Sequence, residues 1–327
     1  MSKICYGCGA ILQTEDVDKK GYIREHKLAN SSYCMRCFRM MHYGDESRFS
    51  TPKEAKEIIN KINKDNRFVI FLVDFLNIND EVIKLFKSIK KRKLLVINKC
   101  ELLPPSVSPQ SIYNYVVNHY GIYDPIRIKG GTTNHGVTVI KRFLEDNYIK
   151  EAYVLGLSNS GKSTLINDMM KVMGSSKKTI NVSSKANTTL DFIRLELSKD
   201  LLLIDSPGFI LDNSLMTEMS AKKVKEFIIQ VRENETISLI DEKYFVKFEE
   251  KTPINFYTYA KCTNPIHKYH KLVDGLKTRI ELPKGKCVDI VIKGIGFIRV
   301  KKGCVISSTI PKKYIEIRES IFGGNNE

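Results

Sequence analysis

The chain has 327 residues, of which 42% are hydrophobic and 28% are charged, an ordinary composition for a folded protein of two or three domains. Lysine and arginine number 53 against 37 acidic residues, which gives a net charge of +16 and favours polyanionic partners, nucleic acid before an acidic membrane surface. No apolar run reaches the roughly 18 residues of a membrane span, and the first residues lack the apolar core of a secretory signal. We therefore expect a cytoplasmic protein without a membrane segment.

Two Cys-x-x-Cys pairs, Cys5 with Cys8 and Cys34 with Cys37, lie within residues 1–48. Each pair places two thiolates on one tight turn, and two pairs complete the closed tetrahedral site of structural zinc. A redox dithiol is the alternative, but a redox pair usually occurs once, beside a βαβ unit. Without a secretory signal, a disulfide framework is not expected. We predict a zinc-binding module with four cysteine ligands at 1–48 that folds around its metal.

Residues 49–155 alternate between strand and helix patterns. We predict a parallel α/β sheet with strands over 68–74, 93–97, 125–129 and 152–155, and helices over 80–90, 109–119 and 136–147. The second strand runs into Asn98-Lys99-Cys100-Glu101, and nucleotide sites in such sheets lie beyond the carboxyl ends of the strands. A carboxylate accepts hydrogen bonds from the N1–H and the 2-amino group of guanine. Asn98, Lys99 and Glu101 are therefore candidate base-binding residues.

A phosphate-binding loop follows the last of these strands. Residues 156–163, GLSNSGKS, match GxxxxGK[ST] between a predicted strand and a predicted helix over 162–173, which is the context that the motif requires. Its glycines let backbone amides surround phosphate oxygens, and the helix N-terminus adds partial positive charge. The lysine reaches the β- and γ-phosphates, and the serine hydroxyl holds Mg²⁺. The predicted nucleotide-binding residues here are Gly156, Ser158, Asn159, Ser160, Gly161, Lys162, Ser163 and Thr164.

Two further loops occupy the positions of magnesium and γ-phosphate ligands. The apolar strand 201–204 ends at Asp205-Ser-Pro-Gly208, where a carboxylate can hold Mg²⁺ and a glycine lets the next amide meet the γ-phosphate. Thr188 and Thr189 precede a predicted strand over 190–197. A threonine hydroxyl there would complete the magnesium shell, and the alternative is an ordinary loop. The predicted magnesium ligands are Ser163, Thr188, Thr189 and Asp205.

The base-binding half of this domain precedes its phosphate-binding half, which reverses the usual order in small GTPases. Circular permutation explains the order, because it is tolerated where the termini of a domain lie close together. The predicted fold class is α/β, with a circularly permuted P-loop GTPase domain at 49–215, the N-terminal zinc module and a C-terminal β-rich α+β domain at 216–327. In that last domain we predict a helix over 216–236 and strands beyond about residue 243.

The basic surplus is concentrated in the C-terminal domain. Between Lys261 and Lys313 there are 13 basic and 3 acidic residues. Lysines neutralise phosphates, and interleaved aromatic residues stack on bases. We therefore predict RNA binding by this domain, with a solvated lysine-rich surface as the alternative.

These motifs together resemble those of the YqeH-type circularly permuted ribosome-assembly GTPases. The resemblance rests on Cys5-Tyr-Gly-Cys8-Gly, Cys34-Met-Arg-Cys37, Asn98-Lys-Cys-Glu-Leu-Leu-Pro104, Gly156–Ser163, Asn187-Thr-Thr-Leu190, Asp205-Ser-Pro-Gly208 and Asp289-Ile-Val-Ile-Lys-Gly-Ile-Gly-Phe297. It implies a GTPase that acts in assembly of the small (30S) ribosomal subunit and binds precursor rRNA, with GTP or GDP, Mg²⁺ and Zn²⁺ as cofactors.

Some residue roles follow from the resemblance alone. Asn159 occupies the position at which similar GTPases bind K⁺ between the phosphates, and the alternative is a structural residue. Glu101 stands where the family has Asp, which puts guanine selectivity in question. Gly130 and Gly131 replace a Ser-Ala loop and could offer amides to the guanine oxygen. Phe209 stands where Ras-like GTPases orient water with Gln, so slow, potassium-stimulated hydrolysis is expected.

The resulting hypothesis is a nucleotide switch that controls binding to precursor rRNA. The γ-phosphate would draw the two threonines and Gly208 inward. A less selective NTPase and a non-catalytic, nucleotide-gated scaffold are alternatives, whereas a membrane-surface GTPase has no anchor signal. The oligomeric state is open, with a monomer as the expectation. The predicted catalytic set is Lys162, Asn159, Asp205, Gly208, Thr188 and Thr189.

Overall fold

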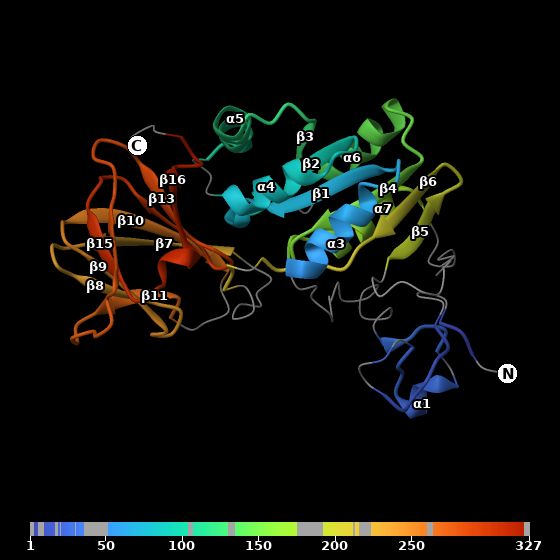
Figure 1. Ribbon diagram of the computed structural model, residues 1–327, viewed down its shortest axis with the longest axis horizontal. Helices are drawn as coiled ribbons and strands as arrows, with labels where there is room; N and C mark the ends of the chain where they lie inside the picture. Colours follow the sequence, from blue (N-terminus) through green and yellow to red (C-terminus); the bar gives the residue numbers. More distant parts are fainter. Residues whose placement is uncertain are drawn as a thin grey trace. The chain divides into compact units, whose positions relative to one another are not determined.

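The structure is a computed structural model of the chain (Figure 1). It describes residues 3–5, 10–16, 19, 21–29, 31–35, 52–103, 107–129, 135–174, 192–211, 213–215, 224–259 and 264–323. The chain divides into two compact units. The first comprises Met1–Asp74, Lys84–Glu101 and Asp124–Leu211, and the second comprises Phe75–Ile83, Leu102–Tyr123 and Asp212–Glu327. Within the described ranges, no helix is long and apolar enough to cross a membrane.

A six-stranded sheet forms the centre of the first unit, with the order β3-β2-β1-β4-β6-β5. All neighbouring pairs are parallel except β6 with β5, which is antiparallel. Every residue of β1 and β2 is buried, as expected for parallel strands that are covered on both faces. The strands are β1 (Phe68–Asp74), β2 (Lys93–Asn98), β3 (Ile126–Ile128), β4 (Glu151–Gly156), β5 (Ile193–Ser198) and β6 (Leu201–Asp205).

Helices connect these strands, and several of them pack on the sheet. Leu144 of α6 and Met169 of α7 belong to one buried cluster with side chains from β1, β2, β4, β5 and β6. Phe86 of α4 packs against Phe71 of β1, with 5.6 Å between the ring centroids. The helices are α3 (Pro52–Ile62), α4 (Asp80–Ser88), α5 (Pro109–Tyr120), α6 (His135–Asp146) and α7 (Lys162–Val172), with short 3-10 turns η1 (Phe75–Asn77) and η2 (Cys100–Leu102).

The sheet order confirms the permuted arrangement predicted from the sequence. The strand that leads into the phosphate loop, β4, lies between β1 and β6, although β1, β2 and β3 all precede it in the chain. The carboxyl ends of β2, β4 and β6 therefore meet at one edge of the sheet, because these strands run in the same direction. This edge brings the three predicted nucleotide loops together.

The described strands of the second unit form two five-stranded sheets, with the orders β16-β13-β14-β10-β7 and β11-β8-β9-β15-β12. All of their pairs are antiparallel. The strands are β7 (Val224–Val231), β8 (Thr236–Leu239), β9 (Tyr244–Phe248), β10 (Thr252–Tyr259), β11 (Ile266–Tyr269), β12 (Thr278–Glu281), β13 (Val288–Ile292), β14 (Gly296–Val300), β15 (Val305–Ser308) and β16 (Ile315–Glu319), with a 3-10 turn η4 (Lys312–Tyr314).

The prediction of a helix over 216–236 is wrong for the part that the structure describes. Val224–Val231 is strand β7, which pairs antiparallel with β10 along its whole length. The side chains of Val224, Phe227, Ile228 and Val231 fit a helical spacing, but this segment is also rich in β-branched and aromatic residues, which favour strands. Val231 is buried whereas Ile228 is 72% exposed, as strand alternation requires. Among its described residues the C-terminal region is β-structure without an α-helix, not the predicted α+β domain.

Candidate nucleotide-binding site

The loop between β4 and α7 has a backbone that only glycine can adopt at two positions. Gly156 has φ +159°, and a Cβ atom there would lie 2.4 Å from the carbonyl oxygen of Leu72. Gly161 has φ +95°, and a Cβ atom there would lie 2.2 Å from Nδ2 of Asn98. Both distances are shorter than any van der Waals contact between such atoms. The glycines of the motif therefore allow the loop to approach β1 and the last residue of β2.

The polar side chains of the phosphate loop point into the protein. Lys162 is 1% exposed, and its Nζ lies 3.5 Å from the carbonyl oxygen of Gly156. Ser163 is also buried. The hydroxyl oxygens of Ser158 and Ser160 are buried and have no hydrogen-bond partner among the described residues. Because a buried, unsatisfied hydroxyl is costly, such groups suit a site that a polar ligand completes.

The Asn98-Lys99 loop is hydrogen-bonded to the phosphate loop. Asn98 donates from Nδ2 to the carbonyl oxygen of Ser160 at 2.8 Å, and Lys99 donates from Nζ to the carbonyl oxygen of Asn159 at 2.5 Å. The same ammonium lies 3.5 Å from a carboxylate oxygen of Asp74, which is fully buried at the end of β1. Thus two loops about sixty residues apart in the sequence form one structure.

The predicted guanine-binding residue Glu101 is exposed on η2, directly after the buried Cys100. Burial, with the nearby charges of Glu101 and Asp74, raises the pKa of the Cys100 thiol to about 12. The backbone amide of Cys100 donates to the carbonyl oxygen of Lys129, at the end of β3, at 3.2 Å. The loop that presents Glu101 is therefore hydrogen-bonded to the residue that follows β3. Gly130 and Gly131 lie outside the described residues.

The loop after β6 is also bound to the phosphate loop. Asp205 ends β6 next to Val154 of β4 and is buried, so its carboxylate lies at the same edge of the sheet as Ser163. Ser163 and Asp205, two of the predicted magnesium ligands, are both buried. The backbone amide of Ser158 donates to the carbonyl oxygen of Phe209 at 2.9 Å. The predicted ligands Thr188 and Thr189 lie outside the described residues.

Phe209, which follows Gly208, cannot orient the attacking water molecule. Its side chain is fully buried, and its ring lies 6.2 Å from that of Phe71 between centroids. An apolar ring in a core offers no hydrogen bond to a nucleophile. Any group that orients the attacking water must therefore come from elsewhere.

In the N-terminal module the structure describes one cysteine from each predicted pair. Cys5 and Cys34 are both buried, in a small cluster with Leu12 and Ile23. The backbone amide of Cys34 donates to Sγ of Cys5 at 3.1 Å, so one cysteine of each predicted pair lies beside the other. Cys8 and Cys37 lie outside the described residues. Within the described ranges, no group of three or more His, Cys, Asp or Glu side chains is arranged to hold a metal ion.

Asp74 and Lys129 are buried charged residues near the nucleotide loops that the sequence analysis did not single out. Asp74 ends an otherwise apolar buried strand, at the carboxyl edge where ligands bind in such sheets. Lys129 is buried beside Asp168 of α7, with 3.6 Å between Nζ and Oδ2. In the sequence it is one lysine among many, so no local pattern marked it.

The sheet order, the phosphate loop after β4 and the base loop after β2 define a circularly permuted P-loop GTPase domain. Comparison with known proteins agrees with this class. The family model described as "50S ribosome-binding GTPase" matches residues 151–260. This match begins at β4, so the base-binding half of the sheet lies before it in the chain.

The chain is 29% identical to YqeH of Bacillus subtilis over 231 residues, which cover 68% of this chain and 63% of YqeH. It is 25% identical over 197 residues to Arabidopsis thaliana NO-associated protein 1, chloroplastic/mitochondrial, covering 52% of this chain and 35% of that protein. The solved structure of YjeQ from Thermotoga maritima is 21% identical, with a TM-score of 0.31, and covers 44% of this chain and 48% of that one. The chain thus spans less than two thirds of the length of these relatives. The sequence matches support a YqeH-type circularly permuted GTPase.

Proposed function

We propose that the protein binds and hydrolyses GTP in the assembly of the small (30S) ribosomal subunit, with the nucleotide state controlling its binding to precursor rRNA. The observation that carries the nucleotide part is the pair of hydrogen bonds from Asn98 and Lys99 to carbonyl oxygens of the phosphate loop. The two loops are therefore bonded to each other, although the chain presents their motifs in reversed order. Similarity to YqeH and the ribosome-binding description of the matched family support the ribosomal part.

The chemistry assigned to this site is phosphoryl transfer to water. Lys162 and the loop amides would bind the β- and γ-phosphates, and Ser163 and Asp205, with Thr188 or Thr189, would hold Mg²⁺, which neutralises the developing charge. Because Phe209 is buried in the core, intrinsic hydrolysis should be slow. K⁺ at Asn159 would add positive charge near the phosphates, so we propose stimulation by potassium.

Further parts of the proposal concern the flanking regions. Cys5, Cys8, Cys34 and Cys37 would hold a structural zinc ion, and the C-terminal sheets would contact RNA in the cytoplasm. Several basic side chains of the C-terminal stretch are already paired: Lys268 with Glu235, Arg279 with Glu249, and Lys286 with Glu319. The net charge that this stretch offers to RNA is therefore smaller than its sequence count indicates.

The test is sedimentation of the chain with purified small and large ribosomal subunits and with precursor particles, in Mg²⁺ and KCl. Samples contain a non-hydrolysable GTP analogue, GDP or the matching ATP analogue. The proposal expects binding to small-subunit particles with the GTP analogue only. Binding to the large subunit alone would refute the 30S assignment. The large subunit is included because the matched family is described as 50S ribosome-binding. Binding in every nucleotide state would refute the switch.

A less selective NTPase or a nucleotide-gated scaffold is the second candidate. Two observations favour it: Glu101 adds a methylene to the base-binding carboxylate, and Phe209 leaves the site without a water-orienting side chain. Turnover of GTP and ATP, each measured in KCl and in NaCl, separates the candidates. A GTPase hydrolyses GTP faster in KCl, whereas a scaffold shows no turnover in either salt.

A further inference from the structure

A second polar surface lies at the end of the sheet opposite the nucleotide loops. Those loops follow the carboxyl ends of β2, β4 and β6, whereas three other turns precede the amino ends of the adjacent strands β2, β1 and β4. β1 has seven residues, so the two ends are separated by about 20 Å at about 3.3 Å per residue. A ligand at the amino ends would therefore leave the nucleotide site accessible.

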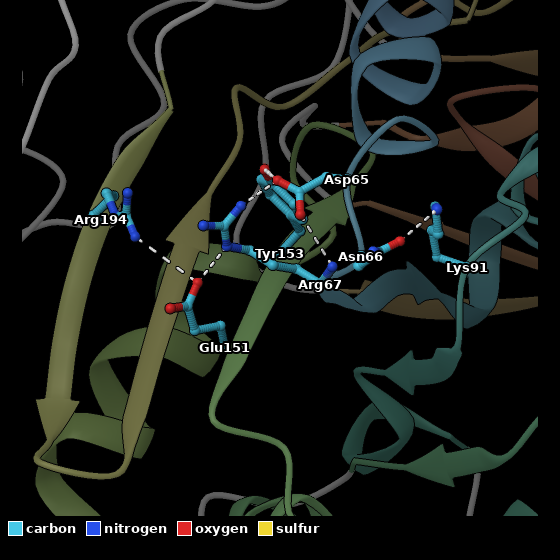
Figure 2. Close-up of polar contacts among 7 residues, drawn as sticks. All are labelled: Asp65, Asn66, Arg67, Lys91, Glu151, Tyr153 and Arg194. Atoms are coloured by element: carbon cyan, nitrogen blue, oxygen red, sulfur yellow. Dashed lines mark hydrogen bonds and ion pairs between the residues drawn. The ribbon is translucent and has the colours of Figure 1, made fainter.

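Hydrogen bonds hold the turns before β1 and β2 together. Asn63, just after α3, donates from Nδ2 to the carbonyl oxygen of Ser88 at 3.0 Å and accepts from the backbone amide of Lys90 at 2.8 Å. Lys91 donates from Nζ to Oδ1 of Asn66 at 3.2 Å, as Figure 2 shows. Two segments far apart in the sequence are thus fixed side by side, and each of them carries cations.

Most cations of these turns face solvent, although Lys93 is buried and lies 3.8 Å from a carboxylate oxygen of Asp124. Lys64, Lys90 and Arg92 are exposed, and residues 87–93, KSIKKRK, contain five basic residues and no acidic one. Lys150, also exposed, extends the row to the turn before β4. Adjacent strands are about 4.8 Å apart, so a row across three strands has the scale of a few nucleotides of an extended chain.

Two carboxylates at this end of the sheet, Asp65 and Glu151, are engaged with other groups. Arg67 bonds to both Asp65 and Glu151, the hydroxyl of Tyr153 donates to Asp65 at 2.8 Å, and Arg194 lies 3.8 Å from Glu151 (Figure 2). Burial raises the pKa of Asp65, but the hydrogen bonds from Tyr153 and Arg67 lower it overall. Asp65 therefore stays ionised and balances Arg67 instead of the exposed lysines.

An aromatic side chain accompanies the cations. Tyr148, in the turn before β4, is 90% exposed, and it is the one large apolar side chain on these three turns that is fully in solvent among the described residues. A single exposed ring beside cations suits base stacking, whereas a membrane surface would call for a wider apolar patch. Asp146, exposed at the end of α6, and Asp200, exposed in the turn before β6, offset two of the positive charges.

We propose that these turns bind single-stranded RNA, with cations on the phosphates and the Tyr148 ring stacked on a base. The amino-end surface is defined as Lys64, Lys90, Lys91, Arg92, Tyr148 and Lys150. The choice of RNA as partner rests on the proposed function, and the inference goes beyond it by placing an RNA contact on the GTPase domain itself. Nucleotide and RNA would then bind the two ends of the same strands at the same time.

The test compares matched variants of the full chain. The triple variant Lys64→Ala, Lys90→Ala, Arg92→Ala removes three exposed cations from the surface. Its control, Lys56→Ala, Lys84→Ala, Arg142→Ala, removes three exposed cations from helices elsewhere. Binding of a labelled polyuridylate oligonucleotide and of small-subunit rRNA is measured over a series of KCl concentrations. Each lost phosphate contact lowers the slope of log K against log salt by about 0.7 for single strands, so the surface variant should lose about 2 from the slope and bind at least tenfold more weakly.

Stacking is tested separately by Tyr148→Ala, which should weaken binding about fivefold or more, and by Tyr148→Phe, which keeps the ring and should bind as the wild type does. Equal losses in the surface and control triples would overturn the proposal, since the attraction would then be diffuse. Displacement of the RNA by polyglutamate at equal charge concentration, or binding to phosphatidylserine vesicles without binding to RNA, would also overturn it. Failure of the proposed GTPase function is distinguishable, because it appears as absent GTP binding by a wild-type chain that still binds RNA.

Discussion

The contact between Gly161 and Asn98 makes a quantitative prediction about how the two nucleotide loops depend on each other. In Gly161→Ala, the new Cβ would lie 2.2 Å from Nδ2 of Asn98, so the amide side chain must move. It then loses its 2.8 Å hydrogen bond to Ser160, which costs about 1–3 kcal/mol for a buried acceptor left unsatisfied. The φ of +95° at this position adds strain of about 1–3 kcal/mol.

A double-mutant cycle separates these two contributions. Asn98→Ala alone should cost about 1–3 kcal/mol, and the double variant should cost little more than Gly161→Ala alone, because the hydrogen bond can be lost only once. The expected coupling energy is therefore about 1–3 kcal/mol. The assay is the affinity for a fluorescent guanine nucleotide and the free energy of unfolding in urea, for all four proteins. Additive costs would refute the reasoning, because they would mean that the residues do not meet.

Two further predictions concern the base and the metal. Glu101→Asp shortens the carboxylate by one methylene and should raise the preference for GTP over ATP about tenfold, the equivalent of about 1.4 kcal/mol; an unchanged ratio in competition binding would place guanine selection elsewhere. Cys5→Ser removes a sulfur that accepts a hydrogen bond from the backbone amide of Cys34 and should abolish bound zinc, measured by inductively coupled plasma mass spectrometry, while Cys287→Ser in the second unit should retain it. Zinc retained by Cys5→Ser would refute the predicted ligand set.

Most of the first unit follows from its sequence because its strands are continuous apolar runs. Phe68–Asp74 and Lys93–Asn98 are buried at every position, and their short length and their content of β-branched residues favour strands over buried helices. The order of the strands also followed, since the position of each nucleotide motif at a strand end fixes where that strand must lie in the sheet.

The second unit was less predictable because its apolar residues fit two periods. In Val224–Val231 the same side chains satisfy a helical spacing and a strand alternation, and pairing with β10 decides between them. Contacts between residues far apart in the chain could not be predicted from the sequence either. Nothing in the sequence shows that Lys99 reaches both Asp74 and the phosphate loop.

The position of Phe209 sets a condition on any nucleotide switch in this chain. The segment after Gly208 leads toward the C-terminal region, but Phe209 is anchored first: its carbonyl oxygen accepts from Ser158, its amide lies 3.4 Å from the carbonyl oxygen of Gly156, and its ring is buried. Motion at Gly208 can pass along the chain only if these bonds break, at a net cost of about 1 kcal/mol each. A γ-phosphate can supply that amount, so the switch is physically feasible. Hydrogen exchange reports it directly. If the switch acts through this segment, the Ser158 and Phe209 amides should exchange at least fivefold faster in one nucleotide state than in the other. Equal protection in the GTP-analogue and GDP states would mean that motion at Gly208 does not pass beyond Phe209. The nucleotide would then have to act on RNA binding by another route.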